Sequence, residues 1–164
     1  MLYLRKPRQS DIAAVKALYD RSASLHRPWT YPPKDYEAYL LEEYRYFLCM
    51  EQSHQIVGTF NISGVIRANF YSAYLGYEVF SPFEGRGYMR RGLKLLIEEA
   101  FGNLNLHRLE ANIQPGNEVS IKLVARAGFV REGFSKEYLN IGDDGWKHHE
   151  RWALINDHWL DINL

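Results

Sequence analysis

Two glycines, Gly85 and Gly87, stand between an alternating apolar run and the strongest amphipathic pattern of the chain. That pattern places Leu93, Leu96 and Ala100 on one face of a helix that would begin just after Gly87. The first N–H groups of a helix lack partners within it, and glycines before them let an anion approach the backbone closely. These residue types and their spacing predict an anion-binding turn suited to a phosphate group.

The two glycines admit other interpretations. Gly85 and Gly87 could only shape a turn between a strand and a helix. A dinucleotide-binding fingerprint needs an early strand and a third glycine at another offset than that of Gly92. A P-loop needs Gly-Lys-Ser/Thr, which does not follow here. Any anion would therefore be held by local backbone donors.

The elements that must position this turn follow from apolar periodicity and capping residues. We expect strands over residues 2–5, 46–50, 55–66, 73–80 and 107–114, and two more within 129–155 around a turn at 142–145. We expect helices after Ser10-Asp11, after Asp35, after Gly87 with a stop at Gly102, and after Asn117 with a stop at Gly128. Residues 22–33, polar and proline-rich, should form an irregular loop. The order predicts a single α/β domain over residues 1–164, with a mixed, largely antiparallel sheet.

Charge and cysteine content limit the classes of function. Lys and Arg (20) balance Asp and Glu (20), so no global field draws the chain to nucleic acid or anionic lipid. Cys49 is the single cysteine, which excludes an internal disulfide, and its apolar surroundings favour a core position. The cluster His148-His149-Glu150 is no metal site, because neighbours on a strand point to opposite faces. Without a long apolar stretch, we expect a soluble, cytoplasmic protein.

The glycine turn resembles the Gln/Arg-x-x-Gly-x-Gly/Ala signature of the GNAT acetyltransferases, and stands here as Glu84-Gly85-Arg86-Gly87-Tyr88-Met89. Glu84 and Met89 depart from that signature. Further segments resemble the RimJ/RimL type, the ribosomal-protein-alanine N-acetyltransferases, at residues 27–29, 56–58, 106–111, 117–121, 127–133 and 138–140. The resemblance covers nearly the whole chain and implies a GNAT fold, a mixed sheet of about seven strands flanked by helices.

The resemblance implies acetyl-CoA as co-substrate, with no metal. Backbone groups of Val79 and Phe80 would pair with the pantetheine arm, and Asn117 would contact the same arm. The pyrophosphate would be bound by a run of amides, those of Gly85, Arg86, Gly87, Tyr88 and Met89. Asn117 could also serve only as a helix cap, and the two roles are compatible.

Transfer of an acetyl group from a thioester to an amine needs a neutral amine, an oxyanion donor and a proton for the departing thiolate. Many family members place a tyrosine acid seven residues after the capping Asn, where this chain has Val124. The RimL-type resemblance instead implies Ser120 as acid and Glu137 as base. Ser120 could equally be a first-turn residue bonded to backbone, and Glu137 a solvated carboxylate. Two polar residues on one strand face could position a base water instead, Glu110 and Asn112.

Trp29 and Tyr31, in the proline-rich loop, are expected to line the acceptor mouth, with packing over the sheet edge as the alternative. The resemblance implies acetylation of a primary amine, foremost the N-terminal α-amine of a protein such as a ribosomal protein. A polyamine, amino acid or antibiotic is the alternative acceptor. A CoA-binding module without turnover is the alternative of another class. No nucleic-acid or membrane partner is expected.

Overall fold

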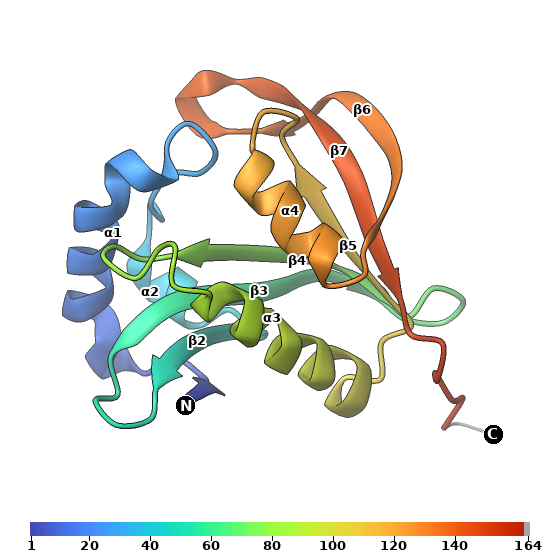
Figure 1. The fold of residues 1–164 in the computed structure, drawn as a ribbon, viewed down its shortest axis with the longest axis horizontal. Coiled ribbons are helices and arrows are strands. Elements are labelled where there is room, and N and C mark those ends of the chain that lie inside the picture. The colour runs from blue at the N-terminus through green and yellow to red at the C-terminus, as the bar shows by residue number, and fades with distance from the viewer. Residues whose placement is uncertain (163–164) are drawn as a thin grey trace.

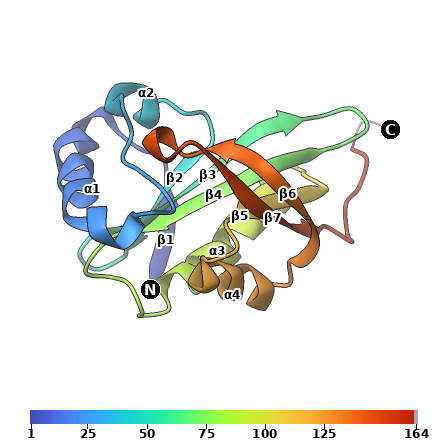
Figure 2. The same ribbon diagram turned by 90° about the horizontal axis from the view of Figure 1, so that it is seen from above.

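The computed structural model describes residues 1–162, which form a seven-stranded sheet with helices on both faces, as Figure 1 and Figure 2 show. The strands are β1 (Leu2–Arg5), β2 (Arg45–Met50), β3 (Ile56–Ile66), β4 (Ser72–Val79), β5 (Arg108–Ile113), β6 (Val130–Asn140) and β7 (Trp146–Ile155). Their order is β1-β2-β3-β4-β5-β7-β6, with β4 and β5 parallel and the other described pairs antiparallel. The predicted mixed, largely antiparallel α/β sheet is confirmed.

Two pairs of helices cover the sheet. They are α1 (Ile12–His26) with α2 (Tyr36–Leu40), and α3 (Tyr88–Glu98) with α4 (Glu118–Arg126). Side chains alternate along β2, so Phe47 and Cys49 pack in the cluster of α1 and α2, whereas Leu48 packs in that of α3 and α4. The two helix pairs therefore lie on opposite faces (Figure 2). Within the described residues, no helix is long and apolar enough to cross a bilayer.

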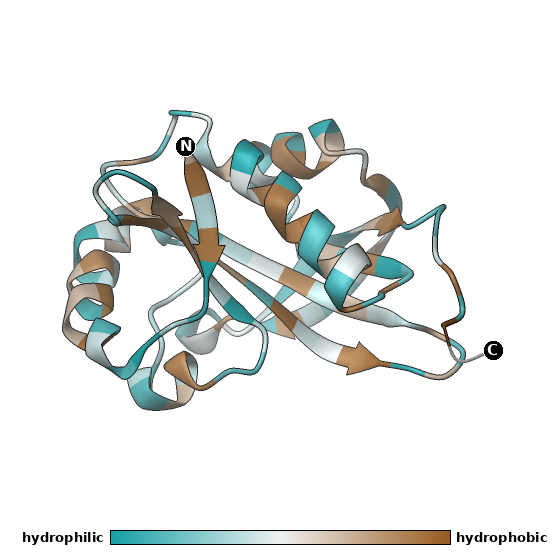
Figure 3. Ribbon diagram, turned by 90° about the horizontal axis from the view of Figure 1, so that it is seen from below, coloured by the Kyte–Doolittle hydropathy of each residue, from teal (hydrophilic) through white to brown (hydrophobic). Residues whose placement is uncertain are grey.

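α3 is amphipathic, as its periodicity predicts. Leu93 and Leu96 are fully buried, while hydrophilic residues alternate with them along the helix (Figure 3). At Gly92 any Cβ would come within 2.5 Å of the Leu48 side chain, so this glycine lets α3 pack closely on β2. The close packing places the N-terminus of α3 directly beside the sheet.

Gly102 does not end this helix, contrary to the prediction. The chain continues through a π-helix, η2 (Glu99–Asn103), and stops at Leu104. Phe101 and Leu104 pack against the larger core cluster. Packing of these partly buried side chains offsets the roughly 1 kcal/mol that glycine costs inside a helix.

α1 extends to His26, so the predicted loop over residues 22–33 begins five residues too early. Ser22 and His26 are buried against the segment that follows β4. Ser22 Oγ accepts a hydrogen bond from the Ser81 amide at 2.9 Å, and His26 Nε2 lies 2.7 Å from the Val79 carbonyl oxygen. Polar residues that resemble a loop in sequence therefore form the buried face of a helix, because backbone groups of a distant segment satisfy them.

Of the two aspartates predicted to cap helices, one does so and the other binds elsewhere. Asp35 accepts from the Ala38 amide at the start of α2, as predicted. Asp11 precedes α1 as predicted, but its carboxylate does not cap that helix. It binds the Arg5 guanidinium at 2.8 and 2.9 Å and the Arg8 amide at 2.7 Å instead. Asp11 thus ties α1 to the end of β1.

β4 and β5 separate after a short parallel ladder that joins residues 72–74 to 108–110 (Figure 1). The Phe80 amide donates to Val57 on β3, so by alternation the backbone groups of Glu78 and Phe80 face β3. Those of Tyr77 and Val79 face the side on which β5 has moved away. The sheet is therefore open along this part of β4.

Candidate active site

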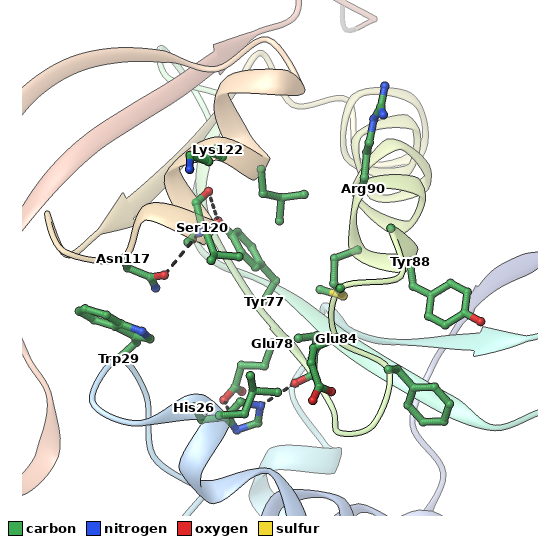
Figure 4. Close-up of a pocket in the computed structure, with 18 of the residues that line it drawn as sticks. His26, Trp29, Tyr77, Glu78, Glu84, Tyr88, Arg90, Asn117, Ser120 and Lys122 are labelled. Carbon is green, nitrogen blue, oxygen red and sulfur yellow. Dashed lines mark hydrogen bonds and ion pairs between the residues drawn. The ribbon is translucent and has the colours of Figure 1, made fainter.

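A cavity of about 610 Å³ lies beside the open part of β4, between α4 and the N-terminus of α3 (Figure 4). It brings together most of the predicted site residues, namely Trp29, Val79, Gly85, Gly87, Tyr88, Met89, Asn117 and Ser120. Four predicted site residues do not line it: Tyr31, Phe80, Arg86 and Glu137.

The predicted anion-binding turn forms at one end of this cavity. Gly85 and Gly87 adopt φ of +73° and +75°, the left-handed region that glycine occupies without strain, and Gly87 caps α3. Nothing lies within 4 Å of a Cβ built on either glycine, so the turn is open toward a ligand. Sequence reasoning missed the charged side chains that join it in the lining, Arg90, Lys122 and Arg126. A helix N-terminus and three cations together suit a polyphosphate.

The two predicted pantetheine contacts differ in their surroundings. Val79 lines the cavity and its carbonyl accepts from His26. Phe80 is fully buried, its amide donates to the Val57 carbonyl and its own carbonyl accepts from the Phe83 amide. Both backbone groups of Phe80 are thus engaged within the fold, which leaves Val79 as the member of the pair that faces the cavity.

The first turn of α4 forms the opposite wall of the cavity. Asn117 Oδ1 accepts from the Ser120 amide at 3.4 Å, so the capping role of Asn117 is present while the residue also lines the cavity. The Ser120 hydroxyl lies 2.5 Å from the hydroxyl of Tyr77 on β4. Burial raises the pKa of Tyr77 to about 12, with the Ser120 hydrogen bond acting weakly in the other direction. Tyr77 therefore stays protonated at neutral pH.

Sequence reasoning missed Glu78, whose carboxylate collects three side chains from α1 and the loop after it. The Tyr19 hydroxyl donates to it at 2.7 Å, the Thr30 hydroxyl donates at 2.5 Å, and His26 Nδ1 lies at 3.4 Å. Burial, together with the Glu78 charge, raises the pKa of Tyr19, which keeps that hydroxyl a donor. A signal was present in the sequence, since Glu78 is a carboxylate near the end of a strand that leads into the glycine turn.

His26 lies between the carbonyl oxygen of Val79 and the carboxylate of Glu78. A carbonyl oxygen can only accept, so His26 Nε2 must carry the proton that it donates to Val79. His26 Nδ1 then faces a carboxylate oxygen of Glu78, and two lone pairs would repel each other there. The cavity wall thus carries an imidazole and a carboxylate in contact, the two side-chain types that most often serve as general bases.

A second cavity, of about 500 Å³, adjoins α2. Glu78 is the residue that lines both cavities, so its carboxylate stands in the wall between them. Tyr31 lines the second cavity and its hydroxyl donates to Asp144 in the β6–β7 turn, η3 (Gly142–Asp144). Trp29 packs near Gly116, where an added Cβ would meet its ring at 3.1 Å. The loop that carries both aromatic residues thus reaches two distant loops of the site, and acceptor contact stays a prediction for each residue.

Glu137, the base implied by the resemblance, lies on an exposed bulge of β6 and lines neither cavity. Its φ is +44°, and its amide donates to His148 Nδ1 at 2.9 Å. The other suggested residues, Glu110 and Asn112, also lie outside both linings, and Glu110 pairs with Arg108 at 3.0 Å. The catalytic role of Glu137 remains a prediction without support from its position.

Cys49 is completely buried, as predicted, and burial raises the pKa of its thiol, so it is not a nucleophile of this site. His148 and His149 bind different partners: His148 accepts from Glu137, while His149 Nδ1 lies 2.8 Å from the Lys147 carbonyl. No group of three possible metal ligands occurs in residues 1–162.

Comparison with known proteins agrees with this geometry. The chain is 38% identical to the [ribosomal protein uS5]-alanine N-acetyltransferase of Escherichia coli over 64% of its own length and 54% of the relative's, so it spans about half of that relative. A ribosomal-protein-S5-alanine acetyltransferase from Vibrio fischeri superposes with a TM-score of 0.86 at 29% identity, covering 98% of this chain and 96% of the other. Mycobacterium smegmatis RimJ, solved in complex with CoA-disulfide, gives 0.82 at 25% identity, covering 98% and 84%. The family model of the acetyltransferase (GNAT) domain matches residues 1–130, and the chain therefore belongs to the GNAT acetyltransferase domain family.

Proposed function

We propose that this protein transfers the acetyl group of acetyl-CoA to a primary amine. The observation that carries the proposal is one continuous cavity that joins the N-terminus of α3 to Ser120 along the open part of β4. Its α3 end suits the phosphates of CoA, and Val79 lines the cavity, where its amide would face the pantetheine arm. The thioester would then lie beside Ser120. At the position that the resemblance gives to the acid, we assign the Ser120 hydroxyl as the hydrogen-bond donor that assists departure of the thiolate.

The amine would reach the thioester from the second cavity. Glu78, in the wall common to both cavities, lies where an amine entering from α2 would meet the acetyl group. With His26 beside it, the carboxylate can accept the proton that the attacking nitrogen loses. This geometry supports Glu78 over Glu137 as the base.

We propose the N-terminal α-amine of a protein, such as a ribosomal protein, as the acceptor. The support is the 38% identity to an enzyme named [ribosomal protein uS5]-alanine N-acetyltransferase. Chemistry favours the same acceptor, because an α-amine has a pKa of about 8 and a lysine one of about 10.4. Neutralising the lysine at pH 7.4 costs about 3 kcal/mol more, which a weak base in the wall does not supply.

Thiol release from acetyl-CoA tests the proposal with three acceptors: an alanine-starting peptide that contains one lysine, the same peptide blocked at its N-terminus, and spermidine. We expect turnover with the free peptide and at least about 100-fold less with the blocked one. Equal turnover on the blocked peptide would refute the α-amine assignment, and turnover with spermidine alone would establish the small-amine alternative. Binding of CoA without thiol release from any acceptor would identify a binding module.

A further inference from the structure

Two hydroxyl groups meet in the cavity although 43 residues separate them in the sequence. Tyr77 Oη lies 2.5 Å from Ser120 Oγ and 3.4 Å from the Ser120 carbonyl oxygen (Figure 4). The Tyr77 ring packs beside Phe60, with ring centroids 6.2 Å apart, which directs the phenol toward α4. A tyrosine of the sheet therefore reaches the first turn of the helix on the other side of the cavity.

The contact leaves one proton of the pair available to a ligand. Either oxygen can be the donor, and the phenol is the stronger acid of the two. When Tyr77 donates to Ser120 Oγ, the Ser120 hydroxyl keeps its own proton and can turn it into the cavity. Without Tyr77, the Ser120 hydroxyl would be free to rotate and to hydrogen-bond the backbone of its own helix turn.

We propose that Tyr77 is a positioning residue, whose hydroxyl donates to Ser120 Oγ and thereby aims the Ser120 hydroxyl at the sulfur that leaves acetyl-CoA. The inference rests on the proposed acetyl transfer. In that step the amine nitrogen bonds to the carbonyl carbon, the carbon–sulfur bond breaks with its electron pair on sulfur, and the amine proton passes to the base. Tyr77 thus supplies a phenol to the cavity from the sheet, facing Ser120 on α4.

The relative basicity of the leaving thiolate and the Tyr77 phenolate decides whether the hydroxyl pair transfers a proton to the sulfur or only hydrogen-bonds it. A thiol ionises at a pKa of about 8.5, whereas burial raises the pKa of Tyr77 to about 12. The thiolate is therefore a far weaker base than the Tyr77 phenolate, and both hydroxyls keep their protons. The pair acts as a preorganised donor to developing negative charge, in the way that an oxyanion hole does, and CoA leaves as a thiolate.

Ionisation of bound CoA tests this without any acceptor. The ultraviolet absorbance of the thiolate is titrated from about pH 6 to 9.5 at saturating CoA, with desulfo-CoA as the blank that removes tyrosine and Cys49 signals. The comparison includes Tyr77→Phe, Ser120→Ala and the matched control Tyr74→Phe, which removes an exposed phenol from the same strand. Affinity for CoA and circular dichroism verify that each variant is folded.

We expect the thiol of bound CoA to ionise about one pH unit below that of free CoA in the wild type and in Tyr74→Phe. Tyr77→Phe should remove at least half of this shift, and Ser120→Ala nearly all of it. Wild-type protein in which bound CoA ionises like free CoA would overturn the proposal without any variant. A Tyr77→Phe titration that matches the wild type would overturn it as well. Since acceptors are absent, these results are independent of whether the peptide panel identifies an acceptor.

Discussion

At the α3 end of the candidate site, the groups offered to a ligand are backbone N–H groups exposed by Gly85 and Gly87. At the β4 end they are side chains, because Glu78 gathers donors from Tyr19 and Thr30 and faces His26. The first region is built around a local turn whose backbone donors need no particular side chain, although Arg90, Lys122 and Arg126 add charge beside it. The second depends on side chains brought together from separate elements. Binding of the co-substrate and proton transfer to the base should therefore fail separately when each region is mutated.

Glu78→Gln should have the largest effect. The amide keeps the size of the carboxylate but cannot accept the amine proton, so kcat should fall by about 10²–10⁴ while affinity for CoA stays nearly unchanged. Steady-state kinetics with saturating acceptor, beside calorimetry with CoA, measure both quantities. Glu137→Gln is the matched comparison and should remain within about threefold of the wild type. The reverse ranking would return the role of base to Glu137.

Gly87→Val should impair the glycine turn at the N-terminus of α3. A branched side chain at a φ of +75° costs about 1–2 kcal/mol and would crowd the donors of the turn, so affinity for CoA should fall by about 10–100-fold. The fold should persist, since nothing within 4 Å would contact the new Cβ. Gly102→Val, later in the same helical segment and also free of contacts, serves as the control for helix propensity. Calorimetry that finds unchanged CoA affinity in a folded Gly87→Val protein would remove the turn from the site.

Asp11→Asn should have the smallest effect. It should lower the free energy of unfolding through the α1 side of the protein and leave the glycine turn unchanged. Burial pushes the pKa of Asp11 upward, but the Arg5 guanidinium and the Arg8 amide outweigh it and hold that pKa below its ordinary value. A carboxylate whose pKa is depressed in the folded protein stabilises the fold at pH values above its unfolded pKa, about 3.9. This stabilisation is lost as the pH falls through the folded pKa. The variant should therefore lose about 1.5–3 kcal/mol of unfolding free energy at pH 7 and progressively less below about pH 4.

Urea unfolding at pH 7 and pH 3, with Asp20→Asn as an exposed control on the same helix, measures this effect. CoA affinity should not change, since Asp11 lies at the start of α1 and lines neither cavity. An equal loss of stability at both pH values would show that Asp11 acts through packing and not through its charge.

Most of the fold could be predicted from the sequence because its signals are local. Alternation along β5 buries Leu109, Ala111 and Ile113, as expected, and Asn117 both caps α4 and lines the cavity. Predictions failed where distant groups altered a local preference. Ser22 and His26 belong to a helix because Ser81 and Val79 satisfy their side chains from almost 60 and 53 residues away.

The sequence by itself determined the glycine turn before α3, since two left-handed positions followed by an amphipathic helix need no long-range information. Tertiary structure alone decided the polar chemistry of the cavity. Glu78 meets Tyr19 across 59 residues and Tyr77 meets Ser120 across 43, and no periodicity of 2 or 3.6 residues encodes such meetings. They arise because β4 separates from β5 and because a helix pair packs on each face of the sheet. Side chains from these helices therefore reach the open part of β4.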